Sequence, residues 1–324
     1  MIKIESMAQA KIEQIARDIR TMRIRGAGRI ARAAAGALKT AAKTSKARTP
    51  TEFMRELDRV SSLLLSTRPT AVSLPNAVKF VMLGARRAEG AGLRDLREAI
   101  VSRADEFIKN SKEAVDRIGE IGARRISRGD VILTHCNSDC ALAIIKTAFK
   151  QGKRIKAFVT ESRPMRQGFI SIRELSRAGI PTTLIVDSAV RHFIRDIDKV
   201  IVGADSIAAN GAVINKIGTS QIALVAHEAR VPFFVAAESY KFNPGTLAGQ
   251  LVEIEEREPN EIVDPKRFPR VKIRNPVFDI TPPEYVDLIV TERGIIPPPA
   301  AYTIIQDLFE WKPGEELKLV KHTD

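Results

Sequence analysis

The sequence predicts an α/β protein in which an N-terminal helical domain, residues 1–126, precedes a Rossmann-like parallel-sheet domain, residues 127–324. Before residue 127, apolar residues recur near the 3.6-residue period of amphipathic helices. From Asp130 onward, short β-branched runs alternate with helix-like segments, which is typical of a parallel sheet with right-handed crossovers. The chain has 324 residues, 44% of them hydrophobic and 28% charged, which suits two globular domains.

The helical pattern of the first domain is interrupted by turn signals. Thr49-Pro50-Thr51-Glu52 predicts a helix start, because proline suits the first helical turn. Residues 66–76 contain two prolines and predict a break. The helices are expected at residues 7–22, 30–42, 51–65 and 93–126.

The second domain is expected to contain short buried strands separated by helices. Glu253–Pro283 is rich in proline and charge and predicts an extended excursion before the last strand. A final helix is expected at residues 301–309. The strands are expected at residues 131–134, 155–160, 182–186, 200–202, 232–236 and 287–291.

The charge is concentrated in the first domain. Residues 1–126 carry 26 Lys and Arg against 14 Asp and Glu, whereas the remaining residues carry 26 against 25. Nucleic-acid binding is not expected, because acidic and basic residues are interleaved and this region offers too few aromatic side chains for base stacking. A positive field would instead steer a phosphorylated substrate toward the protein.

The cysteine content favours a reducing compartment. Two cysteines four residues apart form no disulfide framework, and they fall short of a zinc site, so we expect a cytoplasmic protein without a metal. No apolar run approaches the length of a membrane span, and the N-terminal residues lack the apolar core of a secretory signal.

The strongest candidate for chemistry is Cys136, which follows the expected strand at residues 131–134. Asn137, Ser138 and Asp139 come next and can cap a following helix. A thiol near a helix N-terminus and cations has a lowered pKa, which makes it a competent base. A buried structural cysteine is the alternative, and Cys140, one turn on, is expected to serve mainly in packing.

Asp205 is the second candidate, because it emerges from the apolar run at residues 200–202. Ligands of open α/β sheets bind beyond the carboxyl ends of the strands, so Asp205 and Cys136 can share one substrate. An apolar cleft there would favour the protonated acid. Asn215 and Lys216 follow ten residues later, and the lysine suits a phosphate.

Three weaker signals indicate anion binding. The turn Arg25-Gly26-Ala27-Gly28 precedes an Ala-rich helix and could cradle a phosphate with its N–H groups. Arg68 is followed by proline, and a rigid arginine can clamp a phosphate. Lys241 follows the expected strand at residues 232–236, on the ligand side of the sheet.

Taken together and in this order, the motifs resemble one superfamily. They are Arg25-Gly-Ala-Gly28, Thr67-Arg-Pro-Thr70, Thr134-His-Cys-Asn-Ser138, Gly203-Ala-Asp-Ser-Ile207, Asn215-Lys-Ile-Gly-Thr219 and Tyr240-Lys-Phe242. The superfamily joins methylthioribose-1-phosphate isomerases, the α, β and δ subunits of translation initiation factor 2B, and archaeal ribose-1,5-bisphosphate isomerases. The resemblance covers nearly the whole chain.

The chain is most similar to the ribose-1,5-bisphosphate isomerase branch. Methylthioribose-1-phosphate isomerases typically have proline where this chain has Gly28, and a Pro/Ser/Thr-rich segment around the position of Lys241. A methylthio group needs an apolar pocket, whereas a second phosphate needs a cation. The non-catalytic translation-factor subunits commonly lack the cysteine and aspartate as a pair. Both other branches remain alternatives.

The resemblance implies that Cys136 accepts a proton and Asp205 donates one during conversion of ribose 1,5-bisphosphate to ribulose 1,5-bisphosphate, in nucleoside-phosphate (AMP) salvage. It further implies a homohexamer built from dimers, with no metal or organic cofactor. Arg163 is an additional candidate for substrate binding. The implied substrate-binding residues are Arg25, Gly26, Ala27, Gly28, Arg68, Ser138, Asp139, Cys140, Asn215, Lys216 and Lys241.

Overall fold

The chain divides into two compact units, Met1–Glu113 and Ala114–Asp324. The computed structural model describes residues 2–21, 23–24, 26–68, 72–87, 90, 92–249 and 251–309. The division falls inside one helix, α5 (Leu93–Ala123). The domain boundary expected after residue 126 follows the end of this helix instead, and it stays a prediction.

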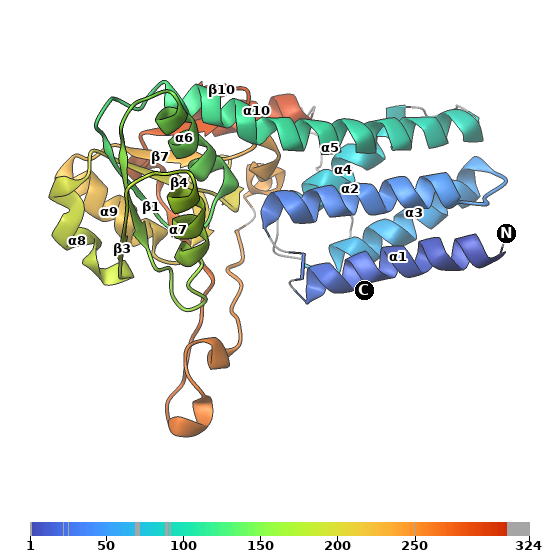
Figure 1. Cartoon of the computed structure of the whole chain (residues 1–324). Helices are drawn as coiled ribbons and strands as arrows, with labels where there is room; N and C mark the ends of the chain where they lie inside the picture. The colour runs from blue at the N-terminus through green and yellow to red at the C-terminus, as the bar shows by residue number, and fades with distance from the viewer. Residues whose placement is uncertain are drawn as a thin grey trace. The chain divides into compact units, whose positions relative to one another are not determined.

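The first unit is helical, as expected (Figure 1). The Ala-rich helix α2 buries small side chains along one face, which lets neighbouring helices approach closely. Residues 66–76 are not a continuous break, because α4 begins at Ser73. Pro75 is tolerated in its first turn, where the missing N–H has no intrahelical partner. The helices are α1 (Ile2–Arg20), α2 (Ala27–Thr44), α3 (Pro50–Leu65), α4 (Ser73–Arg87) and the first part of α5.

The expected start of α3 is confirmed. The side chain of Thr49 accepts a hydrogen bond from the N–H of Glu52, and Pro50 is the first helical residue. The carboxylate of Glu52 in turn accepts from the N–H of Arg48 at 2.9 Å. Two N–H groups at the helix start are thereby satisfied by side chains.

The second unit is built on a seven-stranded sheet with the order β10-β9-β7-β4-β1-β2-β3. All neighbours are parallel except β10, which runs antiparallel to β9. The six expected strands are all present in this sheet, and β10 is its one strand that was not expected. The strands are β1 (Val131–Thr134), β2 (Lys156–Thr160), β3 (Thr182–Ile185), β4 (Lys199–Gly203), β7 (Phe233–Ala236), β9 (Leu288–Thr291) and β10 (Gly294–Ile296).

The topological switch point of this sheet lies between β1 and β4. The chain leaves β1 for β2 and β3 on one side, and it returns to β4 on the other. In doubly wound sheets the ligand crevice lies beyond the carboxyl ends of the strands at such a point. The residues that follow β1 and β4 therefore flank the expected crevice.

Helices cover both faces of the sheet, which explains why the central strands are almost entirely apolar. One buried cluster joins the sheet to the end of α5 and to two further helices, and a second joins it to the remaining three. Figure 1 shows α6 and α7 beside the sheet. The helices are α6 (Asp139–Lys150), α7 (Gly168–Arg177), α8 (Val190–Phe193), α9 (Thr219–Ala229) and α10 (Ala301–Phe309).

A small antiparallel sheet was not expected from the sequence. It consists of β5 (Ser206–Ile207), β6 (Val213–Lys216) and β8 (Phe278–Thr281). These strands are short, and β6 mixes polar with apolar residues, so their pattern is weak. Residues 252–277, which lead into β8, form an arm that projects from the unit (Figure 1).

Single 3₁₀ turns connect many of these elements. One of them, η3, follows β7 and carries a predicted site residue. The turns are η1 (Asp187–Ala189), η2 (Ile194–Asp196), η3 (Ser239–Lys241), η4 (Pro244–Ala248), η5 (Pro259–Glu261), η6 (Pro265–Arg267), η7 (Pro283–Tyr285) and η8 (Pro298–Ala300).

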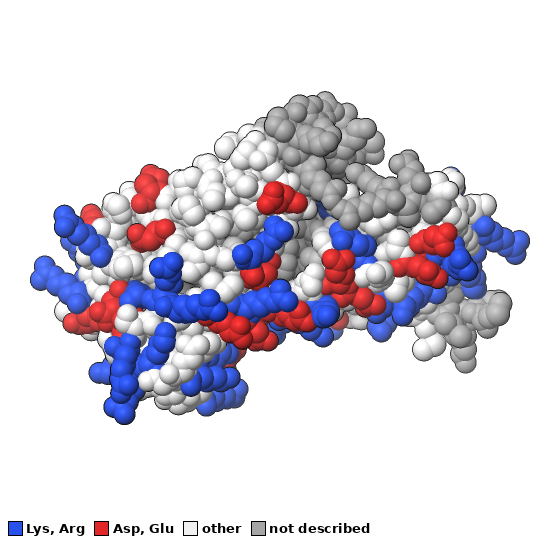
Figure 2. All heavy atoms as spheres, turned by 90° about the horizontal axis from the view of Figure 1, so that it is seen from above, with Lys and Arg blue, Asp and Glu red and all other residues white. Residues whose placement is uncertain are grey.

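The charged surface is mixed in sign. Figure 2 shows Lys and Arg side chains interleaved with Asp and Glu side chains along one face. This arrangement agrees with the interleaving read from the sequence. Within the described part of the chain, none of the helices combines the length and the apolar character that crossing a bilayer requires.

Candidate active site

The backbone of Cys136 is held in an unusual conformation directly after β1. Its φ of 64° lies in the left-handed region, which costs a residue with a side chain roughly 1–2 kcal/mol. Two serines hold it there. The N–H of Cys136 donates to Ser162 Oγ at 2.8 Å, and Ser171 Oγ donates to the Cys136 carbonyl at 2.7 Å. The fold thus holds both the N–H and the carbonyl of Cys136 in place.

The thiol itself is buried, with 9% of Cys136 exposed, and donates to Gln167 Oε1 at 3.5 Å. Burial raises the pKa of Cys136 to about 11, although the Lys216 ammonium acts to lower it. The expectation of a lowered thiol pKa was therefore wrong for the unliganded protein. The sequence pattern located the nearby helix and cation, but it did not indicate how completely the thiol loses water.

The buried ring of His135 connects the loops around Cys136. Its Nδ1 lies 2.5 Å from Thr160 Oγ1, and its Nε2 lies 2.9 Å from the carbonyl of Ile217. A carbonyl only accepts, so Nε2 carries the proton and Nδ1 accepts from the threonine. Burial lowers the pKa of His135, which keeps the ring neutral. His135 therefore joins the ends of β1 and β2 to the residue after Lys216.

Asp187 supports the same region from the end of β3. Its two carboxylate oxygens accept from the N–H groups of Ser162 and Arg163, at 2.7 and 2.8 Å. Ser162 has a φ of 61°, so its loop is also held in the left-handed region. Arg163 is exposed, and its role in binding stays a prediction.

Asp205 lies two residues beyond β4 and is half-buried. Its charge acts on the thiol of Cys136 and also on the ammonium of Lys241. Cys136, Asp205, Lys216 and Lys241 are thus gathered on one side of the sheet, at the ends of β1, β4 and β7 and on β6. The charge of Asp205 thus reaches the thiol of Cys136, and their joint action on one substrate stays a prediction.

The start of α6 approaches the end of β4 closely. Ser138 caps this helix by accepting from the N–H of Ala141 at 3.3 Å, as expected. A Cβ added to Gly203 would lie 2.4 Å from Ser138 Oγ, so only glycine permits this approach. Asp139 is exposed, and Cys140 is buried within the first turn.

Asn215 and Lys216 occupy the end of β6. Lys216 is half-buried, and its Nζ lies 5.2 Å from the centre of the Phe278 ring. Asn215 is buried and donates to Thr219 Oγ1 at 3.0 Å, so its side chain supports the next helix. A direct contact of Asn215 with substrate stays a prediction.

Asp279 closes the start of α9 from the neighbouring strand β8. One carboxylate oxygen accepts from the N–H groups of Gly218 and Ser220, at 2.7 and 3.1 Å. Gly218 has a φ of 102°, and a Cβ there would lie 3.3 Å from the His135 ring. Burial raises the pKa of Asp279 to about 6. No local pattern indicated this residue, because its partner is 61 positions away.

Lys241 is not an open cation. It is 7% exposed, and its Nζ lies 2.8 Å from Glu238 Oε2. Tyr240 donates to the other carboxylate oxygen of Glu238 at 2.8 Å. Glu238 was missed, although its place three residues before Lys241 was a visible signal of an ion pair.

The predicted site residues of the first unit are only partly described. Gly26 precedes α2 with a φ of 88°, and the N–H groups of Ala27 and Gly28 lie in the first turn, where helices leave N–H groups without internal partners. Arg68 is half-buried, and Arg25 lies outside the described residues. That these residues complete the site of the second unit stays a prediction.

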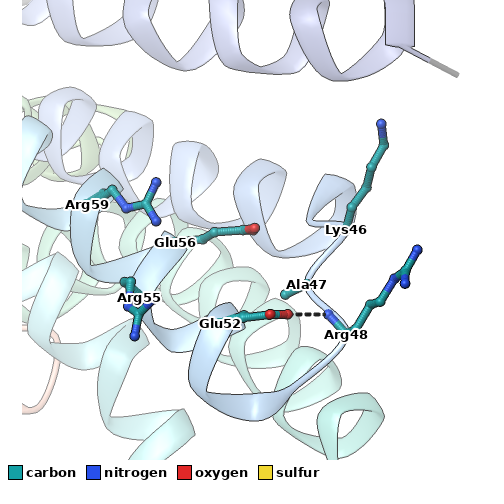
Figure 3. Close-up of a pocket in the computed structure, with 7 residues that line it drawn as sticks. All are labelled: Lys46, Ala47, Arg48, Glu52, Arg55, Glu56 and Arg59. Carbon is teal, nitrogen blue, oxygen red and sulfur yellow. Dashed lines mark hydrogen bonds between the residues drawn. The ribbon is translucent and has the colours of Figure 1, made fainter.

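A surface pocket of about 400 Å³ lies elsewhere in the first unit, around the start of α3 (Figure 3). Four basic residues and two glutamates line it together with Ala47. The carboxylate of Glu52 is directed at the backbone N–H of Arg48, and no predicted site residue takes part. This pocket is therefore not our candidate for the substrate site. The basic residues are Lys46, Arg48, Arg55 and Arg59, and the glutamates are Glu52 and Glu56.

The described residues contain no group of three or more His, Cys, Asp or Glu side chains suited to hold a metal ion. The residues at or after the strand ends of the second unit include a buried thiol, a half-buried carboxyl and two ammonium groups. Such a set can move protons on an anionic substrate while the ammonium groups stabilise developing negative charge.

Comparison with known proteins gives matches over most of the chain. A model of the Initiation factor 2 subunit family matches residues 23–298. Ribose 1,5-bisphosphate isomerase of Pyrococcus furiosus is 54% identical over 312 residues, which cover 94% of this chain and 96% of that protein. Methylthioribose-1-phosphate isomerase of Geotalea uraniireducens is 39% identical over 299 residues, covering 88% of this chain and 86% of that protein.

Solved structures agree with these matches. The structure of the Pyrococcus horikoshii OT3 translation initiation factor eIF-2B has a TM-score of 0.75 at 36% identity. The match covers 89% of this chain and 97% of the chain in that structure. The helical region and the parallel sheet described above thus recur together in a known fold.

Proposed function

The chain belongs to the initiation factor 2 subunit family, and from this premise we propose that it is an isomerase that converts ribose 1,5-bisphosphate to ribulose 1,5-bisphosphate. The observation that carries the proposal is the placement of Cys136 and Asp205 at the ends of β1 and β4. These two strands flank the switch point, where a single substrate can reach both side chains. The 54% identity with an isomerase of that name supports this choice of substrate.

The first chemical step is ring opening. The ring of a free sugar opens spontaneously, but a phosphate on the anomeric carbon prevents this opening. The ring oxygen therefore has to take up a proton as its bond to C1 breaks, and Asp205 donates that proton. Lys216 is assigned to a phosphate of the substrate during this step.

Proton transfer between carbons completes the reaction. The thiolate of Cys136 removes the proton on C2, and the Asp205 carboxylate takes the proton of the 2-hydroxyl, which leaves a phosphoenolate. The thiol of Cys136 then returns its proton to C1, and the ketone forms. Thiolate and carboxylic acid are both regenerated, so the step needs no co-reactant.

Binding is assigned to the remaining predicted residues. Arg25, Gly26, Ala27, Gly28 and Arg68 would hold phosphate from the first unit, through a guanidinium pair and the N–H groups at the start of α2. From the second unit, the start of α6 and the cations would complete the site. The residues there are Ser138, Asp139, Cys140, Asn215, Lys216 and Lys241.

The wider biological role rests on the relatives alone. We place the reaction in AMP salvage and the protein in the cytoplasm, as a homohexamer built from dimers. Eluted mass from light scattering tests the assembly directly. A mass near that of one 35.8 kDa chain would contradict it.

Turnover of two substrates by the purified protein tests the proposed function. We expect ribulose 1,5-bisphosphate to form from ribose 1,5-bisphosphate, with much lower kcat/KM for methylthioribose 1-phosphate. The physical reason is that a methylthio group cannot engage a cation in the place of the second phosphate. The reverse preference would make the protein a methylthioribose-1-phosphate isomerase, and turnover of neither sugar by folded protein would favour a regulatory subunit.

A further inference from the structure

The loop after β7 contains an ion pair between Glu238 and Lys241, and Glu238 has no part in the function proposed above. Glu238 and Lys241 face each other with their charged atoms 2.8 Å apart, and their side chains are 4% and 9% exposed. Tyr240 donates to the second carboxylate oxygen, and Cys140 reaches the same carboxylate from the first turn of α6. A pair this deeply buried is costly to form, so its geometry has to be well satisfied.

The carboxylate determines the charge of the lysine. Burial is the largest single influence and acts to lower the pKa of the Lys241 ammonium, but Glu238, together with Cys140 and Asp205, raises that pKa above the ordinary value of lysine. In return, the lysine and Tyr240 outweigh burial at Glu238 and lower the pKa of that carboxyl. The groups that face Lys241 from neighbouring elements are Cys140 on α6 and Asp205 after β4.

We propose that Glu238 is the positioning residue that keeps Lys241 oriented and charged, so that the buried lysine can recognise the second phosphate of a bisphosphate substrate. An ammonium has three donors, and Glu238 engages one side of it, which leaves donors for a phosphate. Without the carboxylate, a dry lysine would lose its proton near neutral pH and would no longer attract a phosphate. The proposal rests on the proposed function, in which Lys241 contacts that phosphate.

Glu238→Gln gives a signature that a merely structural role would not. In the variant, the pKa of Lys241 is set by burial and falls, so binding of ribulose 1,5-bisphosphate weakens as pH rises through that lowered value. In the wild type the lysine stays charged, so binding stays flat between pH ~7 and ~9.5, where the phosphates are dianions. At the upper end we expect a Kd roughly 10- to 100-fold higher in the variant, the loss of one charge-assisted hydrogen bond.

The test is calorimetric titration of ribulose 1,5-bisphosphate across that pH range. Ribulose 1-phosphate, which lacks the second phosphate, is titrated in parallel, and its Kd should change little in the variant. Adding Lys241→Arg to Glu238→Gln should make binding of the bisphosphate flat with pH again, because a guanidinium stays charged. Glu256→Gln, which removes an exposed ion pair with Arg274 on the arm, is the matched control and should behave as wild type.

A Kd for the bisphosphate that rises equally at every pH in Glu238→Gln, or does not rise, would overturn the proposal. If that variant does not fold, Glu238→Asp replaces it, since it keeps the charge but shortens the reach. Its Kd should be raised and flat with pH, and an unchanged Kd would overturn the positioning role. Failure of the proposed function is read separately, from wild-type protein that neither converts ribose 1,5-bisphosphate nor binds the product.

Discussion

At the scale of single residues, Cys136 combines a fixed backbone with a thiol that resists ionisation. Ser162 and Ser171 hold its peptide groups, while burial raises the thiol pKa to about 11. The reactive form is a thiolate, so the site has to contain a group that favours it. Lys216 is the largest influence that lowers this pKa, so we expect it to favour the thiolate in addition to its proposed role in holding phosphate.

Replacement of Lys216 tests this expectation without any substrate. In Lys216→Met the thiol pKa rises further, so alkylation of Cys136 by iodoacetamide should be slower at every pH from 7 to 9. We expect roughly a tenfold decrease, which corresponds to about 1.4 kcal/mol of Coulomb energy. Peptide mass spectrometry reports the rate at Cys136. Lys216→Arg keeps the charge and should react like wild type, and equal rates in all three proteins would remove Lys216 from this role.

The sequence located the reacting residues better than it described their surroundings. Cys136 and Asp205 are adjacent to apolar runs, so their place at strand ends followed from local pattern. His135, Asp187 and Asp279 act through partners 24 to 82 positions away, which no local pattern encodes. Glu238 was the exception, since it lies within one turn of its partner.

At the scale of elements, the surroundings of Cys136 and Lys216 depend on where the helices α6 and α9 begin. The first turn of α6 touches the end of β4 because Gly203 has no side chain. The start of α9 is held by Asp279 from β8. The apolar parallel strands of the large sheet were predicted, whereas β5, β6 and β8 were missed, because β5 has only two residues and β6 and β8 mix polar with apolar residues. These missed strands carry Lys216 and Asp279. Most helices of the first unit were predicted as well, but α4 was missed.

Asp279→Asn tests how α9 is held. The folded-state pKa of about 6 lies above the value of a free aspartate, so folding favours the protonated acid. Wild-type stability should therefore fall, relative to Asp279→Asn, as pH rises from about 4 to about 6, and the difference should be constant above that. The change should be roughly 1–3 kcal/mol in free energy of unfolding.

Urea unfolding of both proteins at a series of pH values measures this difference. Asparagine retains an oxygen that can accept from Gly218 and Ser220 but does not titrate, which makes it a suitable reference. A difference that does not vary between pH 4 and 6 would show that the carboxyl is ionised without penalty.

At the scale of the whole molecule, two regions with different charge meet in one chain. The first 126 residues hold nearly all of the net charge of +13, whereas residues 127–324, which include Cys136 and Asp205, are almost neutral with 26 Lys and Arg against 25 Asp and Glu. The sequence predicted the helical region, the parallel sheet, and the two strands after which Cys136 and Asp205 come. The spacing of Glu238 and Lys241 indicates an ion pair, but the sequence could not show that the pair is buried, because burial depends on packing around β7.

The central claim is that Cys136 moves the proton that turns ribose 1,5-bisphosphate into ribulose 1,5-bisphosphate. The direct measurement is the rate of product formation by wild type and by Cys136→Ser under saturating substrate. We expect rapid formation by wild type and a loss of roughly 10²- to 10⁴-fold in the variant, with unchanged circular dichroism and a similar Kd for the product. Near-normal turnover by the folded variant would contradict the account.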